Sequence, residues 1–388
     1  MIYLDNHATT RVAPEVLPAM LPYFSEEYGN AASVNHAFGW RAAAAVERAR
    51  EQIARRLNCL ADWIVFTSGA TEANNLAIKG VVAAARRRPT EGGAVPHVVT
   101  NATEHPSVLD VAKRPQRNGS DVTVLPVDGC GRVDPQQVVD AIRPATVLVS
   151  VMLANNEVGT LNPIAEIGRV CRERGVLLHC DAVQAVGKIP VDLEQLPVDL
   201  LTLSAHKLHG PKGVGALVVR REGHRIPIEP LFDGGGHEQH LRSGTLSVPL
   251  VVGFGAACEL SADMLDVAVR MAGLRDRLWE RLQTELGGVT LNGHPTERLP
   301  NNLNISFAGV DGEALMSGLK GVAVSSGSAC STAHPEPSHV LRAMGVSEPL
   351  SRASLRFGLS RMTTDAEIDA AALEVIDVVS RLRGMPPG

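Results

Sequence analysis

The chain has 388 residues, of which 45% are hydrophobic and 20% charged, and its formal net charge is −5. These values are ordinary for a soluble globular protein with one large and one small domain, and the modest negative charge argues against nucleic acid or an anionic membrane as the main partner. No apolar run reaches the roughly 18–20 residues that span a bilayer, and no signal-peptide pattern is visible, so we expect a cytoplasmic protein.

The first two-thirds of the sequence alternates between helical and strand patterns. In chain order we expect a helix at 36–57, a strand at 63–67, a helix at 71–88, a strand at 97–100, a helix at 106–112, a strand at 121–127, a helix opening at 134, a strand at 146–153, a helix at 163–174 and strands at 176–180, 200–203 and 215–220. Strands separated by such helices predict an α/β domain whose mostly parallel sheet, of the seven-stranded type, is covered on both faces.

The pattern changes after about Val248. A long helical stretch to about 286 is followed by a strand at 301–307, a helix at 312–319, a Gly/Ser loop, a strand at 354–359 and a terminal helix after Thr363. This order predicts a smaller α+β domain. We therefore expect residues 16–250 to form the large domain and 251–388 the small one. Residues 1–15 should join the small domain, which also carries a cysteine loop at about 325–338.

Two polar residues follow apolar strands that are expected to be parallel. Lys207 comes just after the strand at 200–203, where α/β sheets place their ligands, and partial burial there would suit a lysine to Schiff-base chemistry. A surface lysine in a glycine turn is the alternative. Asp181 ends another strand, and a buried aspartate is costly unless it pairs with a cation, such as a protonated ring nitrogen. The alternative is an aspartate that caps a turn.

A third segment, Ser68-Gly69-Ala70-Thr71-Glu72, stands at an expected helix start. Backbone amides and the helix dipole bind phosphate at such a position. A simple N-cap followed by a glutamate gives the same pattern, so the segment alone is weak evidence.

Together these segments resemble the NifS/IscS-type cysteine desulfurases, within the class V aminotransferase-like pyridoxal-phosphate (PLP) enzymes of fold type I. The matching motifs appear in order along nearly the whole chain, at residues 3–10, 66–72, 103–105, 155–157, 181–184, 206–207, 242–245 and 325–330. The resemblance implies that PLP is the cofactor and L-cysteine the substrate. It also implies a large sheet domain and a smaller domain for the fold.

The resemblance assigns four side chains to the cofactor and its ring. Lys207 would form the Schiff base with PLP and move protons at the substrate Cα. His105 would stack on the pyridine ring and help in proton transfer. Asp181 would pair with the ring nitrogen, and Gln184 would contact the phenolic oxygen. This pairing of an aspartate with the ring nitrogen lets PLP act as an electron sink.

The resemblance also assigns residues to the phosphate of PLP and to the carboxylate of the substrate. The phosphate would be held by Ala70, Thr71, Ser204 and His206. Thr245 of a second subunit would complete that phosphate site, which implies a homodimer. Asn156 would contact cofactor and substrate, and Arg356 would bind the substrate carboxylate with a guanidinium fork that matches a carboxylate in two places.

Cys330 is the expected sulfur acceptor. Its neighbours in 325–338 are small and polar and include Gly and Pro, which is typical of an exposed loop and not of a structural cysteine. The nucleophile must be a thiolate. It would become a persulfide, leave alanine as product and pass its sulfur to a protein acceptor, as in iron–sulfur assembly or tRNA and cofactor thiolation. We expect no metal site, apart from a transient role of Cys330 as an iron–sulfur ligand.

Two departures from the family concern the transfer of sulfur from Cys330 to a protein acceptor. His334 and Pro335 replace small residues after the cysteine, and would stiffen the loop or supply a base. The sequence ends shortly after Arg383, which argues against scaffold docking through a longer C-terminal tail. The alternatives are a selenocysteine lyase, another class V PLP aminotransferase, or a non-catalytic binding protein on the same fold.

Overall fold

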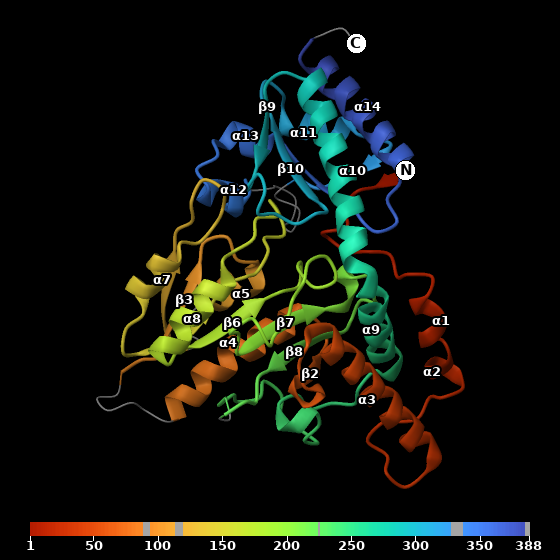
Figure 1. Cartoon of the computed structure of the whole chain (residues 1–388), viewed down its shortest axis with the longest axis vertical. Coiled ribbons are helices and arrows are strands. Elements are labelled where there is room, and N and C mark those ends of the chain that lie inside the picture. The colour runs from red at the N-terminus through yellow and green to blue at the C-terminus, as the bar shows by residue number, and fades with distance from the viewer. Residues whose placement is uncertain (88–93, 113–118, 224–225, 327–336, 385–388) are drawn as a thin grey trace.

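A computed structural model describes residues 1–87, 94–112, 119–223, 226–326 and 337–384 (Figure 1). Its centre is a seven-stranded sheet in the order β2-β8-β7-β6-β5-β3-β4, in which β8 runs antiparallel to both of its neighbours and the other pairs are parallel. The strands are β2 (Ile64–Thr67), β3 (His97–Asn101), β4 (Asp121–Leu125), β5 (Thr146–Ser150), β6 (Leu177–Asp181), β7 (Leu200–Ser204) and β8 (Gly215–Val219). The expected α/β fold with a mostly parallel sheet is confirmed.

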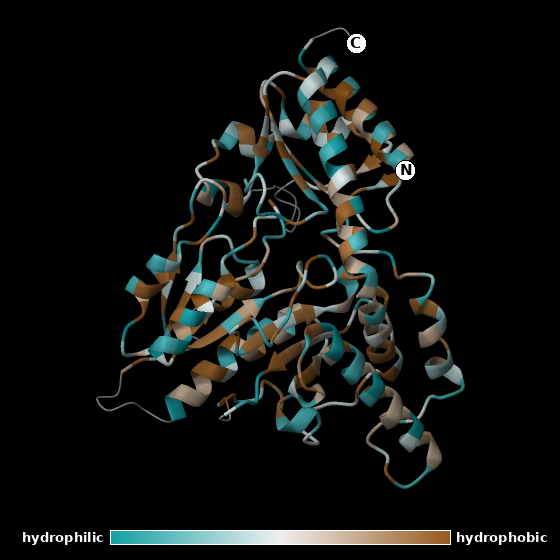
Figure 2. Ribbon diagram, viewed as in Figure 1, coloured by the Kyte–Doolittle hydropathy of each residue, from teal (hydrophilic) through white to brown (hydrophobic). Residues whose placement is uncertain are grey.

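Helices cover both faces of this sheet, because successive strand residues point to opposite sides. Phe66 belongs to one apolar cluster, with α3 (Ala37–Leu57) and α9 (Val248–Leu260), whereas its neighbour Val65 belongs to another, with α4 (Ala70–Arg87). Other helices in the described residues of this part are α1 (Val16–Met20), α2 (Pro22–Ser25), α5 (Pro106–Ala112), α7 (Pro135–Ala141) and α8 (Ile164–Arg174). The central strands are accordingly brown over much of their length in Figure 2.

A second sheet lies at the other end of the molecule, in the order β12-β10-β9, and all its pairs are antiparallel. It consists of β9 (Val289–Asn292), β10 (Asn302–Phe307) and β12 (Ser354–Gly358), and it accompanies α10 (Met264–Glu285), α11 (Gly312–Gly318), α12 (His339–Ala343), α13 (Glu348–Arg352) and α14 (Asp365–Leu382). Its apolar cluster is separate from those of the large sheet. The strand β1 (Ile2–Tyr3) pairs with β11 (Val322–Ala323), so the N-terminus lies beside this second sheet. The exact domain bounds stay a prediction.

The helical stretch Val248–Glu285 is long and apolar enough to cross a membrane by length and composition, and half of its most apolar window is buried. It consists of α9, the turn η4 (Ser261–Asp263) and α10. The buried residues of α9 belong to the cluster that also contains α3, as expected for the core helix of a globular domain. Tertiary packing therefore accounts for its apolar composition.

The sequence-based strands at 121–127 and 146–153 are too long, because pairing stops at Leu125 and Ser150. In the second case the apolar run continues as irregular backbone toward Asn156. The elements β1, β9 and β11 were not predicted, since two to four residues are too few to show a period of two.

Candidate active site

A pocket of about 610 Å³ opens where the strands of the large sheet end and the segment Asp5–Thr9 passes over them. The carboxyl ends of β6 and β7 contribute Asp181 and Ser204, as the rule for ligand sites in open α/β sheets predicts. Gly69, with a φ of +154°, lets the chain turn from β2 into α4 at the rim of the pocket.

Lys207 lies one short 3-10 turn beyond the end of β7, and its side chain reaches back into the pocket. Its Nζ donates to the carbonyl oxygens of His7, at 2.5 Å, and Ala8, at 2.7 Å. These carbonyls hold the amine at the centre of the site, between the sheet and the N-terminal segment. The alternative of a surface lysine in a glycine turn does not fit this placement.

Asp181 is buried, and its two carboxylate oxygens have separate partners. Oδ2 accepts from Asn74 Nδ2 at 2.9 Å, and Oδ1 accepts from the amide of Val183 at 3.0 Å. Asn74 also donates to Ser107 Oγ, which is 2.8 Å from His105 Nδ1. A chain of hydrogen bonds therefore joins the aspartate to the histidine. Neither Asn74 nor Ser107 was predicted from the sequence.

His105 follows β3 and lines the same pocket. Burial lowers the pKa of its imidazole, and the charge of Lys207 lowers it further, whereas Asp181 opposes this shift. The neutral ring keeps one nitrogen for Ser107 and presents an apolar face to a ligand. A neutral imidazole can stack on an aromatic ring and exchange a proton near pH 7.

Gln184 stands in the turn that follows β6, and its amide is held on both sides. Oε1 lies 3.0 Å from His7 Nδ1, and Nε2 donates to the carbonyl of His7 at 3.0 Å. The ammonium group of Lys188 also donates to Oε1, at 3.2 Å. The side chain lines the pocket beside Lys207, where a contact to a ligand was expected.

The start of α4 forms one end of the pocket, with Ala70 and Thr71 in its lining. Amide N–H groups of a first helical turn point out of the helix and attract anions. The carboxylate of Glu72 is already engaged at this helix start, because it accepts hydrogen bonds from Ser68 N and Arg242 Nε. These bonds lower the pKa of Glu72 although its burial acts in the opposite direction. The helix start is therefore both capped and available to a phosphate.

Ser204, His206 and Lys212 add polar groups to the same wall of the pocket. His206 Nδ1 is 3.1 Å from Thr9 Oγ1. Burial, followed by the charges of nearby lysines, lowers the pKa of His206 to about 4. This ring is therefore neutral at pH 7 and can offer a hydrogen bond without a charge, while Lys207 and Lys212 supply positive charge.

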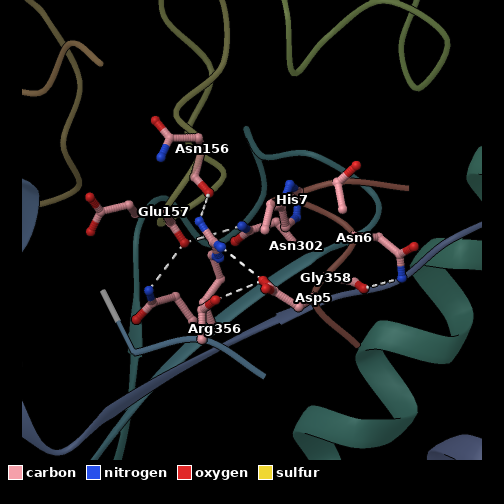
Figure 3. A network of polar contacts seen from close by, with 12 residues as sticks. Asp5, Asn6, His7, Asn156, Glu157, Asn302, Arg356 and Gly358 are labelled. Carbon is pink, nitrogen blue, oxygen red and sulfur yellow. Dashed lines mark hydrogen bonds and ion pairs between the residues drawn. The ribbon is translucent and has the colours of Figure 1, made fainter. Parts of the chain in front are cut away.

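Arg356, on β12, closes the pocket from the side of the smaller sheet (Figure 3). Its Nη2 donates to Asp5 Oδ1 at 2.9 Å and its Nη1 to the carbonyl of Asn156 at 3.0 Å. Its Nε is buried and has no partner within the described part of the chain. Asp5 Oδ1 also accepts from Ser325 Oγ at 2.7 Å. The arginine is thus oriented by two contacts and retains donor capacity for a carboxylate.

Asn156 lines the pocket, and the next residue, Glu157, is buried. Glu157 Oε2 accepts from Ser338 Oγ at 2.5 Å, and its carbonyl accepts from Asn302 and Asn304 (Figure 3). Burial raises the pKa of Glu157 to about 7, although the Ser338 bond and the charge of Arg356 work against the shift. Nearby, His339 Nε2 is 3.0 Å from the carbonyl of Glu104, the residue before His105.

The structure brings together all but two of the side chains expected at the site. The expected residues that line the pocket are Ala70, Thr71, His105, Asn156, Asp181, Gln184, Ser204, His206, Lys207 and Arg356. Thr245 is exposed and does not line it. Cys330, with His334 and Pro335, lies outside the described residues. No group of three His, Cys, Asp or Glu side chains is placed to hold a metal ion within the described ranges.

Known proteins are similar to this chain in sequence and in fold. Residues 2–371 match the aminotransferase class-V family. The chain is 56% identical over 387 residues to the cysteine desulfurase IscS of Anaeromyxobacter dehalogenans, covering 100% of this chain and 94% of that protein. The structure of a NifS-like protein superimposes with a TM-score of 0.89 at 37% identity, covering 98% of this chain and 100% of the other.

A second solved structure, described as SspA in complex with cysteine, has a TM-score of 0.82 at 35% identity and covers 94% of this chain and 100% of that one. These matches extend over both sheets, the N-terminal segment and the pocket between them. The chain therefore belongs to the aminotransferase class-V family and, within it, to the NifS/IscS-type cysteine desulfurases.

Proposed function

We propose that this protein is a PLP-dependent cysteine desulfurase in which Lys207 holds the cofactor and Cys330 takes the sulfur of L-cysteine. The observation that carries the proposal is the position of the residues that flank the cysteine segment. Ser325 lines the pocket and bonds Asp5 beside Arg356, and Ser338 bonds Glu157, which follows Asn156. In the sequence, Cys330 lies between these two residues, five positions after Ser325 and eight before Ser338.

The pocket offers each group that PLP requires. Lys207 supplies a primary amine for the aldehyde. Asp181, held by Asn74 and a backbone amide, supplies a buried carboxylate for a protonated ring nitrogen. The start of α4, with Lys212 nearby, supplies backbone donors and positive charge for the phosphate. His105 supplies a neutral ring to stack on the pyridine.

Bound PLP would supply an electron sink that weakens the substrate Cα–H bond and polarises the Cβ–Sγ bond. Arg356 and Asn156 would hold the substrate carboxylate, and this would fix the orientation of the substrate within the pocket. Lys207 Nζ moves the proton at Cα. Cys330, as a thiolate, attacks the substrate Sγ, and the electron pair of the broken Sγ–Cβ bond stays on carbon.

The net reaction balances without an external oxidant or reductant. The thiol of Cys330 and L-cysteine become the Cys330 persulfide and L-alanine. The transferred sulfur is oxidised to the sulfane level, while Cβ is reduced to a methyl group and takes the proton that Lys207 or His105 returns. A protein acceptor then removes the sulfur and restores the thiol.

The other cysteines do not suit the role of nucleophile. Five of the six lie in the described ranges as free thiols, and none of these lines the pocket. Burial raises the pKa of Cys59, Cys171 and Cys258 to about 12. Burial also raises the pKa of Cys130, and that of Cys180 well above its usual value. Because only the thiolate attacks, these five are poor nucleophiles at pH 7.

The test is to supply PLP-loaded protein with L-cysteine and a thiol reductant, and to measure sulfide and alanine. Equal release of both products is expected. Cys330→Ala should keep the bound cofactor and its response to cysteine but lose sulfide release, with Cys130→Ala as the control that retains it. Formation of a keto acid in place of alanine would indicate an aminotransferase, and wild-type turnover by Cys330→Ala would exclude the assigned nucleophile.

We further propose a cytoplasmic homodimer that delivers sulfur to a protein acceptor. Free thiols are typical of a reducing compartment. Thr245 is exposed and does not line its own pocket, as expected of a residue that completes a partner's phosphate site. Several large apolar side chains are also exposed along α1, α2 and the start of α3, including Phe24, Tyr28 and Trp40. Sedimentation equilibrium would test the dimer.

A further inference from the structure

Lys188 is a buried lysine that the proposed mechanism leaves unused. It follows the turn after β6, and its side chain is only 6% exposed. Its Nζ donates to the carbonyl of Gln184 at 3.0 Å and to Oε1 of the same residue at 3.2 Å. No carboxylate of the described ranges pairs with it. A buried cation without a counter-charge is costly, so its retention calls for a role.

The contact with Gln184 fixes the orientation of an amide at the active site. An ammonium group can only donate, so it must face the amide oxygen and cannot face the NH₂ group. With Oε1 held by Lys188 and His7, Nε2 is left to donate to the carbonyl of His7. That same carbonyl accepts from Lys207 Nζ. One oxygen atom therefore connects the amide held by Lys188 with the amine of the proposed Schiff base.

Lys188 and Lys207 also line one small cavity of about 30 Å³, which is separate from the ligand pocket. Two positive charges that line the same cavity oppose one another. Burial, and then the charge of Lys207, lowers the pKa of Lys188 to about 7. The other ionisable groups that face it are His7, His206, His209 and Arg361, which are cationic when charged.

We propose that Lys188 is a positioning residue for the cofactor amine. It holds the Gln184 amide with Nε2 toward the His7 carbonyl, and its charge beside Lys207 disfavours a second positive charge on that nitrogen. This inference rests on the proposed PLP site and adds a residue that tunes it. The consequence is that the proton on the nitrogen joining Lys207 to PLP is held less tightly than it would be without Lys188.

The experiment is a pH titration of the visible absorbance of the PLP-loaded protein. Lys188→Met keeps the apolar stem but removes the charge and the donors. Its absorbance transition should move to higher pH by about half a unit or more, since the opposing charge is gone. Lys188→Arg retains charge and donors and should restore much of the wild-type midpoint. Lys320→Met removes an exposed lysine and should leave the midpoint unchanged.

Two outcomes would contradict the proposal, and each contradicts a different part of it. A wild-type protein without any visible band after PLP is added overturns the proposed cofactor site, and this inference with it. A wild-type band whose titration is the same in Lys188→Met overturns the role of Lys188 alone. If Lys188→Met does not fold, Lys188→Gln takes its place as the neutral variant, and the same upward shift is required of it.

Discussion

Replacing Glu157 with glutamine should change how the stability of the protein depends on pH. The folded-state pKa of Glu157 is raised to about 7, whereas a glutamate in an unfolded chain titrates near ~4.3. A raised carboxyl pKa contributes stability that is fully present below the unfolded value and is lost as pH rises through the folded one. Over the window from about pH 4.3 to 7 this loss is about 3–4 kcal/mol, at 1.36 kcal/mol per unit.

Glu157→Gln removes the titration but keeps an amide oxygen that can accept from Ser338 Oγ. The variant should therefore become progressively more stable than the wild type between pH 4 and 8. Urea unfolding of both proteins without cofactor, at one protein concentration and several pH values, measures the difference. Glu173→Gln, at an exposed position, is the control and should follow the wild type. A difference between Glu157→Gln and wild type that is constant across this window would refute the reasoning.

Two further substitutions separate the ends of the ligand pocket. Asp181→Asn should retain PLP but lower the rate of sulfide release by about 10- to 100-fold, because a charge-assisted hydrogen bond to the ring nitrogen is replaced by a neutral one. Steady-state kinetics with saturating L-cysteine would measure this rate, and an unchanged rate would contradict the prediction. Arg356→Lys should leave the cofactor absorbance intact and raise the KM for L-cysteine by about 10-fold or more, because lysine lacks the planar fork; an unchanged KM would exclude the arginine from carboxylate binding.

The positions of the main site residues could be predicted because they follow from the local pattern of the large sheet. Apolar strands that end in a polar residue identified Asp181 and Lys207, and parallel strands bring such ends to one edge. The start of α4 was predicted from a glycine turn before an amphipathic run. Each of these local patterns left an alternative open, and the family resemblance was needed to choose between them and to assign His105, Asn156 and Arg356.

The contacts that orient these residues could not be predicted in this way. Asn74 is 107 positions from Asp181, and Asp5 is 351 positions from Arg356. Such pairs depend on how strands and domains are arranged in space, and no local period records them. Asn74 gave one weak signal, a polar residue on the buried face of α4. Thr245 was expected at the phosphate site of a second subunit, and that contact stays a prediction.

The contacts around Arg356 unite two requirements of the proposed reaction. Asp5 Oδ1 accepts from both Arg356 and Ser325, so the group that orients the carboxylate-binding arginine also fixes the residue where the cysteine segment begins. Backbone hydrogen bonds between Ser325 and Arg356 reinforce this link, with Arg356 N donating to Ser325 O at 2.7 Å. A substrate held by Arg356 is therefore held at a defined place relative to the start of that segment. The proposed reaction would use this shared anchor, because it ties the start of the cysteine segment to the arginine that would bind the substrate carboxylate.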